Sequence, residues 1–165
     1  MTVSRSSSAR WISAVVGISL VGAIAYLVVW PAYLNNQVKG QLAEVFMSTD
    51  VCKAEIAQTV QKTTAAALST SLFGCDGGAS SGVKISRYLK SIAIGPSGAI
   101  NVTVDFRSLP ELTPTTSTLT VVPLVDATTP LGTGDVRKTI ATWRCGSPQD
   151  GTTIPSKYLP TNCGG

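Results

Sequence analysis

Residues 11–34 read WISAVVGISLVGAIAYLVVWPAYL, a run of 24 positions without a charged side chain. A helix of this length rises about 36 Å, which is enough to cross a hydrocarbon layer of about 30 Å. Aromatic residues, whose rings favour a membrane interface, stand near both ends of the run: Trp11, Trp30 and Tyr33. We therefore predict a transmembrane helix over residues 11–34.

The charges that flank this run set the expected orientation. Arg5 and Arg10 precede it, whereas the first charge after it is Lys39. Because the flank richer in Lys and Arg stays in the cytoplasm, the N-terminus should be cytoplasmic and the rest of the chain exported. We expect a cytoplasmic leader-like segment over residues 1–10 and a periplasmic or extracellular domain over residues 35–165, held in the inner membrane by a single pass.

Cleavage as a secretory signal peptide is the alternative. Ala23-Ile24-Ala25 resembles a small-residue cleavage site, which would free the chain after Ala25. The apolar run continues through Leu27 to Trp30, however, and is too long for a typical signal core. We favour an uncleaved anchor, and in either case the remainder is exported.

Beyond the membrane segment the pattern is that of an amphipathic helix. Apolar residues recur at steps of three, four or seven, and the opposite face is polar and charged; the apolar positions are Val38, Leu42, Val45, Cys52, Ile56 and Val60. No strong terminator precedes them, so we predict one helix from about residue 11 to residue 62, kinked at Pro31. The apolar stripe has to pack against the rest of the chain.

Short β-type runs follow a Gly- and Ser-rich loop at residues 76–82. They cover residues 91–94, 100–106, 118–125 and 138–143. The second run alternates between apolar and polar residues, and Pro96-Ser97-Gly98 predicts a hairpin turn between the first two. No helical pattern separates the runs, so the sheet should be antiparallel. We expect an α+β fold in which three or four strands pack on the helical stripe.

The composition argues against catalysis. Among 165 residues there is no His, which excludes Ser-His and Cys-His nucleophiles and His-ligated metals. Only three Glu are present, and no base stands near an Asp or Ser in a recognisable motif. No pair of the four Cys has Cys-x-x-Cys spacing. We expect no enzyme activity, no catalytic residue, no cofactor and no metal site.

An exported chain with four cysteines is expected to form disulfides, and three pairings are possible. Cys145 and Cys163 bracket a Pro- and Gly-containing loop that would lack order without a covalent link. Cys52 and Cys75 would then form the second pair. Bridged Cα atoms are less than about 7 Å apart, whereas a helix that continued to Leu72 would place Cys75 about 30 Å from Cys52. This second pair therefore requires the helix to end near residue 62, so that the chain can fold back.

Several motifs together resemble the type IV pilin family, in particular its type IVa group. Residues 31–33, Pro-Ala-Tyr, match the end of the apolar half of the pilin helix, and residues 87–92, RYLKSI, resemble the opening of the pilin sheet. Residues 143–145 and 157–163, WRC and KYLPTNC, resemble the terminal pilin signature. The resemblance covers residues 31–163 and implies a long helix on a four-stranded antiparallel sheet with a C-terminal disulfide loop.

The N-terminus departs from the family pattern. Counting back from Pro31, the Gly of the prepilin peptidase site would fall at Ala9, and the Glu of the membrane helix would fall at Ala14. In the family this Glu helps to dock subunits, and a buried carboxylate in an apolar bundle is costly unless it is paired. We therefore expect a pilin-like chain that lacks the peptidase site.

The resemblance implies a structural subunit of a type IV pilus, in filaments that serve adhesion, motility or DNA uptake. Its partners would be other pilin subunits or the assembly machinery. The implied residues are Trp11, Ala14, Pro31 and Tyr33 for the membrane helix and assembly, and Lys157 and Tyr158 for surface contacts of the disulfide loop. The missing Gly and Glu favour an alternative, an accessory protein anchored in the inner membrane and not assembled.

A DNA-binding receptor is a further alternative that the sequence does not favour. Basic residues gather before the sheet and near its last strand: Lys84, Arg87, Lys90, Arg137, Lys138 and Arg144. The region after Leu34 has 11 basic and 9 acidic residues, however, a net charge of only +2. Neither basic group is interleaved with aromatic residues, so an ordinary solvated surface is the preferred interpretation.

Overall fold

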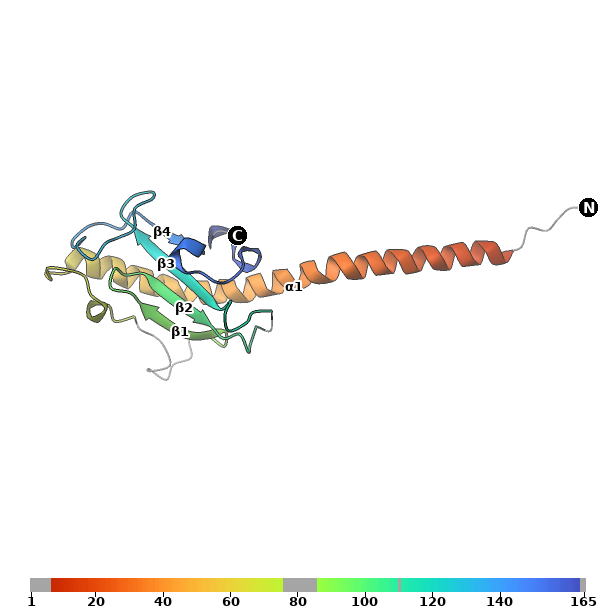
Figure 1. Cartoon of the computed structure of the whole chain (residues 1–165), viewed down its shortest axis with the longest axis horizontal. Helices are drawn as coiled ribbons and strands as arrows, with labels where there is room; N and C mark the ends of the chain where they lie inside the picture. The colour runs from red at the N-terminus through yellow and green to blue at the C-terminus, as the bar shows by residue number, and fades with distance from the viewer. Residues whose placement is uncertain (1–6, 76–85, 110, 164–165) are drawn as a thin grey trace, which may run out of the picture. The chain divides into compact units, whose positions relative to one another are not determined.

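The structure, a computed structural model, describes residues 7–75, 86–109 and 111–163, with side chains from Gly22 onward except Asn162. Helix α1 spans Ser7–Lys62 and precedes a four-stranded sheet (Figure 1). The strands are β1 (Leu89–Ile94), β2 (Ile100–Val104), β3 (Thr118–Leu124) and β4 (Thr142–Cys145). Short 3-10 helices are η1 (Thr70–Leu72), η2 (Pro148–Asp150), η3 (Ser156–Tyr158) and η4 (Thr161–Cys163). The chain divides into two compact units, Met1–Gln37 and Val38–Gly165.

Within the second unit, the predicted apolar stripe of α1 is confirmed. All six of its residues are at most 3% exposed and belong to the main hydrophobic core. A seventh position, Thr49, lies between Val45 and Cys52 and is fully buried. Its hydroxyl donates a hydrogen bond to the carbonyl oxygen of Phe46 at 2.7 Å, so this buried polar atom has a hydrogen-bond partner. The helix ends at Lys62, as expected.

The sheet is an antiparallel meander in the order β1-β2-β3-β4. The predicted alternation in β2 is confirmed, because Ile100, Val102 and Val104 are fully buried and join the core formed by the helix stripe. The predicted hairpin turn is also present. Gly98 adopts a φ of +79°, and a Cβ there would lie only 2.9 Å from Cγ2 of Ile56, so both conformation and space require glycine.

The last strand is where the sequence prediction was wrong. We expected residues 138–143, whereas β4 covers Thr142–Cys145. The preceding connection pairs with the end of β3 at isolated points, where the amides of Leu131 and Ala141 donate to the carbonyls of Pro123 and Leu124 at 2.9 Å, and it does not form a continuous strand there. Asp126 accepts hydrogen bonds from the amides of Thr128 and Thr129, and the amide of Arg137 donates to the carbonyl of Val60 at 2.8 Å. The other strand boundaries differ from the prediction by one or two residues at an end.

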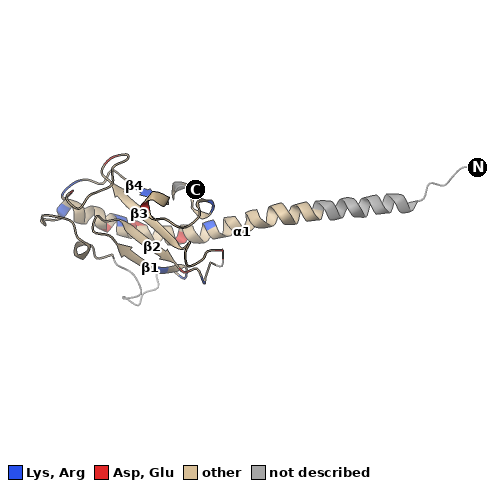
Figure 2. Cartoon of the chain, in the orientation of Figure 1, with Lys and Arg blue, Asp and Glu red and all other residues tan. Residues whose placement is uncertain are grey.

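Charged residues are concentrated on α1 and in the connections. In the strands, only Lys90 of β1 and Arg144 of β4 carry a charge, and the sheet is otherwise drawn tan in Figure 2. The polar positions of the strands are filled by Ser, Thr and Asn, which hydrogen-bond without the cost of burying a charge. The sheet therefore contributes to the low charge content of the sequence.

Candidate functional site

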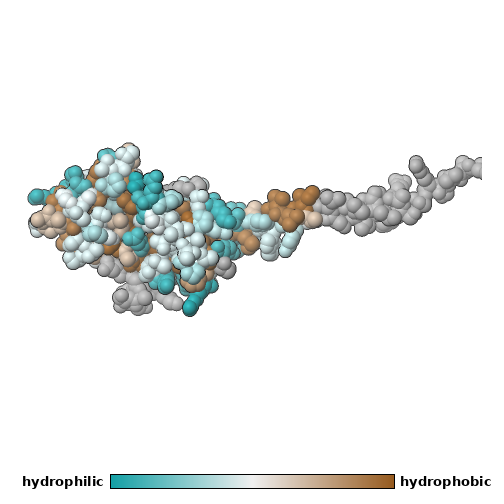
Figure 3. Space-filling model, in the orientation of Figure 1, coloured by the Kyte–Doolittle hydropathy of each residue, from teal (hydrophilic) through white to brown (hydrophobic). Residues whose placement is uncertain are grey.

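The first candidate surface lies on α1 within the unit Met1–Gln37. Seven large apolar side chains there are 53–70% exposed: Ile24, Tyr26, Leu27, Val28, Val29, Trp30 and Tyr33. Five of them are consecutive, so they point in every direction around the helix axis. Figure 3 shows this stretch as hydrophobic surface. Burying one such side chain contributes about 1.5–3 kcal/mol, so the stretch favours an apolar partner by something on the order of 10 kcal/mol.

Three aromatic rings form a row along one side of this stretch. Tyr26 and Trp30 have ring centroids 6.0 Å apart, and Trp30 and Tyr33 are 6.4 Å apart. The side chain of Gln37 donates a hydrogen bond to the hydroxyl of Tyr33. An apolar row that ends in a hydrogen-bonded polar tip is an arrangement suited to a boundary between an apolar phase and water.

The residues predicted for the membrane helix lie only partly in the described region. Pro31 and Tyr33 are exposed on this stretch, and α1 continues through Pro31. Trp11 and Ala14 lie outside the residues whose side chains are described. Among the residues that the structure describes, no helix is both long enough and apolar enough to cross a membrane. The transmembrane span over residues 11–34 therefore stays a prediction.

The second candidate surface is the C-terminal loop of the other unit. A disulfide joins Cys145 at the end of β4 to Cys163, with Cα atoms 4.9 Å apart, as predicted. Gly146 follows the first cysteine with a φ of +75°, and a Cβ at this position would overlap the carbonyl oxygen of Cys163. The two ends of the loop thus touch through the backbone as well as through sulfur.

The loop also forms hydrogen bonds with the part of β3 that does not pair with β4. Pairing with β4 covers β3 from Val121 to Leu124, and residues 152–154 continue beside the preceding part of β3. The amide of Thr153 donates to the carbonyl of Thr118 at 2.9 Å, and the amide of Thr120 donates to the hydroxyl of Thr152 at 3.0 Å. The backbone of β3 is therefore satisfied on this side, and the loop is held as an extension of the sheet.

An arginine fixes the loop to the strand before it. The guanidinium of Arg144 donates two hydrogen bonds of 2.7 Å to the two carboxylate oxygens of Asp150, and a third to the carbonyl of Thr128 at 3.3 Å. These bonds to Asp150 raise the pKa of Arg144 above its ordinary value. A bidentate pair of this kind fixes orientation as well as distance. Together, the three hydrogen bonds of Arg144 join β4 to η2 and to the loop after β3.

The two loop residues predicted to be surface contacts have different environments. Lys157 is exposed, and its ammonium lies 4.6 Å from the centre of the Tyr158 ring. Tyr158 is only 7% exposed and belongs to the core, so the expectation that it lies on the surface was wrong. Tyr158 lies in the 3-10 helix η3 and belongs to the same core cluster as Leu159 and Ile154. Lys157 remains a candidate contact.

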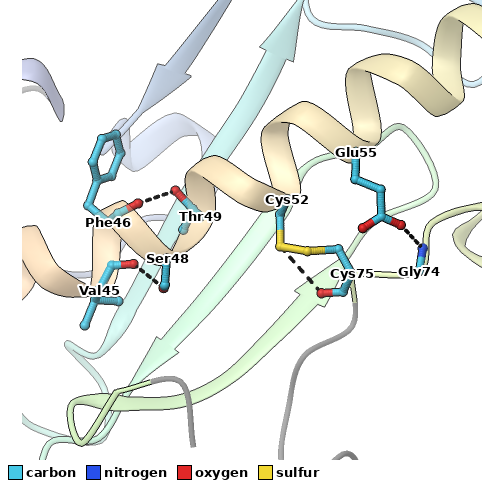
Figure 4. The surroundings of a disulfide bond; sticks show 8 residues. All are labelled: Val45, Phe46, Ser48, Thr49, Cys52, Glu55, Gly74 and Cys75. Carbon is cyan, nitrogen blue, oxygen red and sulfur yellow. Dashed lines mark hydrogen bonds between the residues drawn. A yellow bond between two sulfur atoms is a disulfide. The ribbon is translucent and has the colours of Figure 1, made fainter. Parts of the chain in front are cut away.

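The other predicted disulfide, Cys52–Cys75, attaches the segment after α1 back to the helix (Figure 4). The two Cα atoms are 5.5 Å apart. Beside it, a carboxylate oxygen of Glu55 accepts the amide of Gly74 at 2.8 Å, and farther along the helix Glu44 accepts the hydroxyl of Ser86 at 2.9 Å. The connection from α1 to the sheet is thus held at three points along the helix.

The basic residues that suggested DNA binding do not form one surface of unpaired charge. Arg144 is paired with Asp150, and Lys138 lies 2.8 Å from Asp135. Lys84 falls outside the described residues. Arg87, Lys90 and Arg137 are exposed. The arrangement adds no support for a nucleic-acid site.

Some of the residues that organise these surfaces were not found from the sequence. Thr49 could have been, since it continues the helical stripe at a step of four from Val45. Asp150, Thr152 and Thr153 carried no signal, because their partners are far away in the sequence or lie in a loop without periodicity. Only the folded chain brings Thr152 beside Thr120, a separation of 32 residues.

Comparison with known proteins gives one family and one fold. The family model described as Pilin (bacterial filament) matches residues 38–164. A crystal structure of a type IV pilin from Pseudomonas aeruginosa aligns with a TM-score of 0.55 and 20% identity, covering 76% of this chain and 97% of that one. No curated protein matches the chain. At this identity the structural match concerns the fold, which agrees with the α+β arrangement expected from the sequence.

Proposed function

The chain belongs to the pilin family of bacterial filament proteins, and from this premise we propose that it is a structural subunit of a type IV pilus. Its partners would be other pilin subunits and the assembly machinery. The proposed role is packing and surface contact, not catalysis. Before assembly, residues 11–34 would anchor the chain in the inner membrane with residues 1–10 in the cytoplasm and residues 35–165 outside.

One observation carries this proposal, the exposed apolar stretch at residues 24–33 of α1. The unit that contains it offers no apolar cover for these seven side chains among its described residues. Exposed apolar surface of this extent marks a binding or membrane surface. Lipid could cover it before assembly, and the same stretch of neighbouring copies could cover it in a filament. Copies that bundle here would leave the disulfide loop and Lys157 for outside contacts.

The assembly experiment is mechanical shearing of cells that express the chain, followed by immunoblotting of the sheared filaments and the membranes. We expect the chain in the filament fraction. Its presence in the membrane fraction alone would contradict the filament role and favour the membrane-retained accessory protein.

A paired set of variants tests which surface drives assembly. Trp30→Lys places a charge in the apolar stretch and should reduce the filament fraction at least tenfold, since an unpaired charge is costly to bury. Thr115→Lys adds the same charge at an exposed loop position and should leave assembly unchanged. Equal filament yields from both variants would show that residues 24–33 are not buried in the assembled form.

The second candidate, the membrane-anchored accessory protein, is favoured by one feature of the sequence. Ala14 stands where the family resemblance places a docking glutamate. An Ala14→Glu variant distinguishes the two roles. If the chain is an accessory protein kept from assembly by this residue, the variant should increase its share in sheared filaments. If the chain already assembles without a carboxylate, the variant should leave that share unchanged or lower it, because an unpaired buried charge is costly.

A further inference from the structure

A small hollow lies at the end of the β1–β2 hairpin that is opposite the turn at Gly98. It has a volume of about 230 Å³ and is lined by Lys90, Asp105, Phe106 and Arg107. Lys90 comes from the start of β1, and the other three follow β2 directly. The hollow therefore lies where two adjacent strands meet, and none of its residues belongs to the apolar stretch of α1 or to the C-terminal loop.

The backbone around the hollow is fixed by a strand irregularity and a turn. The register between β1 and β2 shifts between Leu89 and Ser91, which leaves Lys90 as the extra residue of a bulge. A bulge redirects a side chain that regular pairing would place elsewhere. Beyond it, the amide of Asp105 donates to the carbonyl of Tyr88 at 2.8 Å and closes the end of the hairpin.

The turn at Asp105 presents a hydrogen-bond acceptor. One oxygen, Oδ1, accepts the amide of Arg107 at 3.0 Å, and within the described residues Oδ2 has no hydrogen-bond partner. The turn continues with the amide of Ser108 donating to the carbonyl of Asp105 at 3.0 Å. The carboxylate is thus oriented by the backbone and keeps one oxygen for a donor from outside.

The two cations at the hollow differ from the three basic residues of this unit that form ion pairs with aspartates. Lys53, Lys138 and Arg144 each lie 2.7–2.9 Å from an aspartate. Over residues 7–75, 86–109 and 111–163, neither Lys90 nor Arg107 forms an ion pair, and both are exposed. An anion that entered the hollow would not have to displace an existing carboxylate partner.

We propose that this hollow binds a carboxylated sugar. Lys90 and Arg107 would hold the carboxylate, for which a guanidinium provides paired donors. Asp105 Oδ2 would accept a hydroxyl, and the half-buried ring of Phe106 would lie against the apolar face of the sugar. Polar groups that fix orientation beside an aromatic side chain are features of small-ligand sites, and a volume below the usual range of about 300–1,000 Å³ leaves room only for a small ligand such as a single sugar ring.

A nucleic acid fits this hollow less well. Binding a polyanion depends on several cations that follow the backbone of the polymer. Here only two cations line one small space, which is too few to follow a polymer backbone. Sugar binding by single chains does not require assembly, so this proposal and the pilus proposal can fail separately.

The test is a chemical-shift titration of the ¹⁵N-labelled full chain in detergent micelles. The probes are N-acetylneuraminic acid and D-glucuronate, with D-glucose, inorganic sulfate and a twelve-nucleotide oligothymidylate as comparisons. We expect at least one of the two acids to shift the amides of Lys90 and Arg107 in a saturable way, with binding at least tenfold tighter than that of glucose or sulfate. Sulfate binding as tight as the acids, preferential binding of the oligonucleotide at these amides, or no shift with either acid would overturn the proposal.

Two arginine variants give a matched control. Arg107→Ala removes a cation from the hollow and should weaken binding of the acid at least tenfold. Arg87→Ala removes an exposed cation of the same type that does not line the hollow, and should change the affinity less than twofold. Equal weakening by both variants would mean that general charge attraction, and not this hollow, explains the binding.

Discussion

Residues 24–33 and residues 38–60 belong to the same helix and are both rich in large apolar side chains, yet the two stretches differ in how these are covered. In the first, seven such side chains are 53–70% exposed. In the second, the six predicted stripe residues are at most 3% exposed, and exposed apolar residues are few, with Met47 and Val51 as the large ones.

The difference shows that apolar content alone does not tell what a helix does. The second stretch repeats its apolar residues with helical periodicity, so the sheet of the same unit can cover them. The first stretch is apolar in every direction, which no single sheet face could cover. One stretch therefore contributes to the folding of the chain, and the other stays exposed within its own unit.

The largest effect that tests this comparison is expected from truncation at the buried stripe. Ile56 is fully buried, and Ile56→Ala should lower the free energy of unfolding by about 2–5 kcal/mol because it leaves a cavity. Val51→Ala on the same helix and Val29→Ala in the first stretch should each change it by less than about 0.5 kcal/mol, since both residues are exposed. Urea unfolding of the full chain in detergent measures all three. A cost at Val29 equal to that at Ile56 would mean that the two stretches do not differ in this way.

Removal of the C-terminal disulfide should have an effect of similar or smaller size. The Cys145→Ser/Cys163→Ser double variant opens a loop with a sequence separation of 18 and should lower the free energy of unfolding by about 3 kcal/mol. The loss should be confined to the unit Val38–Gly165, because both cysteines belong to it. Thermal unfolding with and without reductant gives the measurement. A wild type that is unaffected by complete reduction would contradict it.

A smaller effect is expected at the charged contact that orients the loop. Arg144→Lys keeps the charge but loses the paired donors to Asp150, and should lower Tm by about 3–5 °C. The control is Asp50→Asn, which breaks the i,i+3 pair with Lys53 on the helix surface and should lower Tm by less than about 1 °C. If the two variants lower Tm equally, the bidentate geometry adds nothing beyond an ordinary surface pair.

The smallest effect is expected from pH at the turn after β3. Hydrogen bonds from the amides of Thr128 and Thr129 lower the pKa of Asp126 from 3.8 to about 2. A carboxyl whose pKa is lower in the folded state stabilises the fold above its unfolded pKa and loses this contribution as pH falls. The Tm advantage of the wild type over Asp126→Asn should thus shrink between about pH 4 and pH 2. A difference that stays constant across this range would contradict the assignment.

Much of the fold could be predicted because its signals are local. The stripe at Val38, Leu42, Val45, Ile56 and Val60 shows helical periodicity, and the alternation from Ile100 to Val104 shows strand periodicity. Gly98 follows from a turn motif. The position of β4 could not be predicted, because Arg137, Asp126 and their partners direct the preceding connection through contacts that leave no repeating pattern.

Some features of the candidate surfaces could likewise be predicted from the sequence, and others could not. The sequence by itself determined the apolar stretch at residues 24–33 and the fold class, since periodicity and composition are properties of neighbouring residues, and it favoured the observed disulfides among three possible pairings. Only the tertiary structure decided that Tyr158 turns inward, that Thr152 and Thr153 extend the edge of β3, and that Lys90 meets Arg107 at one hollow. These contacts depend on how distant segments are placed by burial and backbone hydrogen bonding, and the order of residues along the chain does not record that placement.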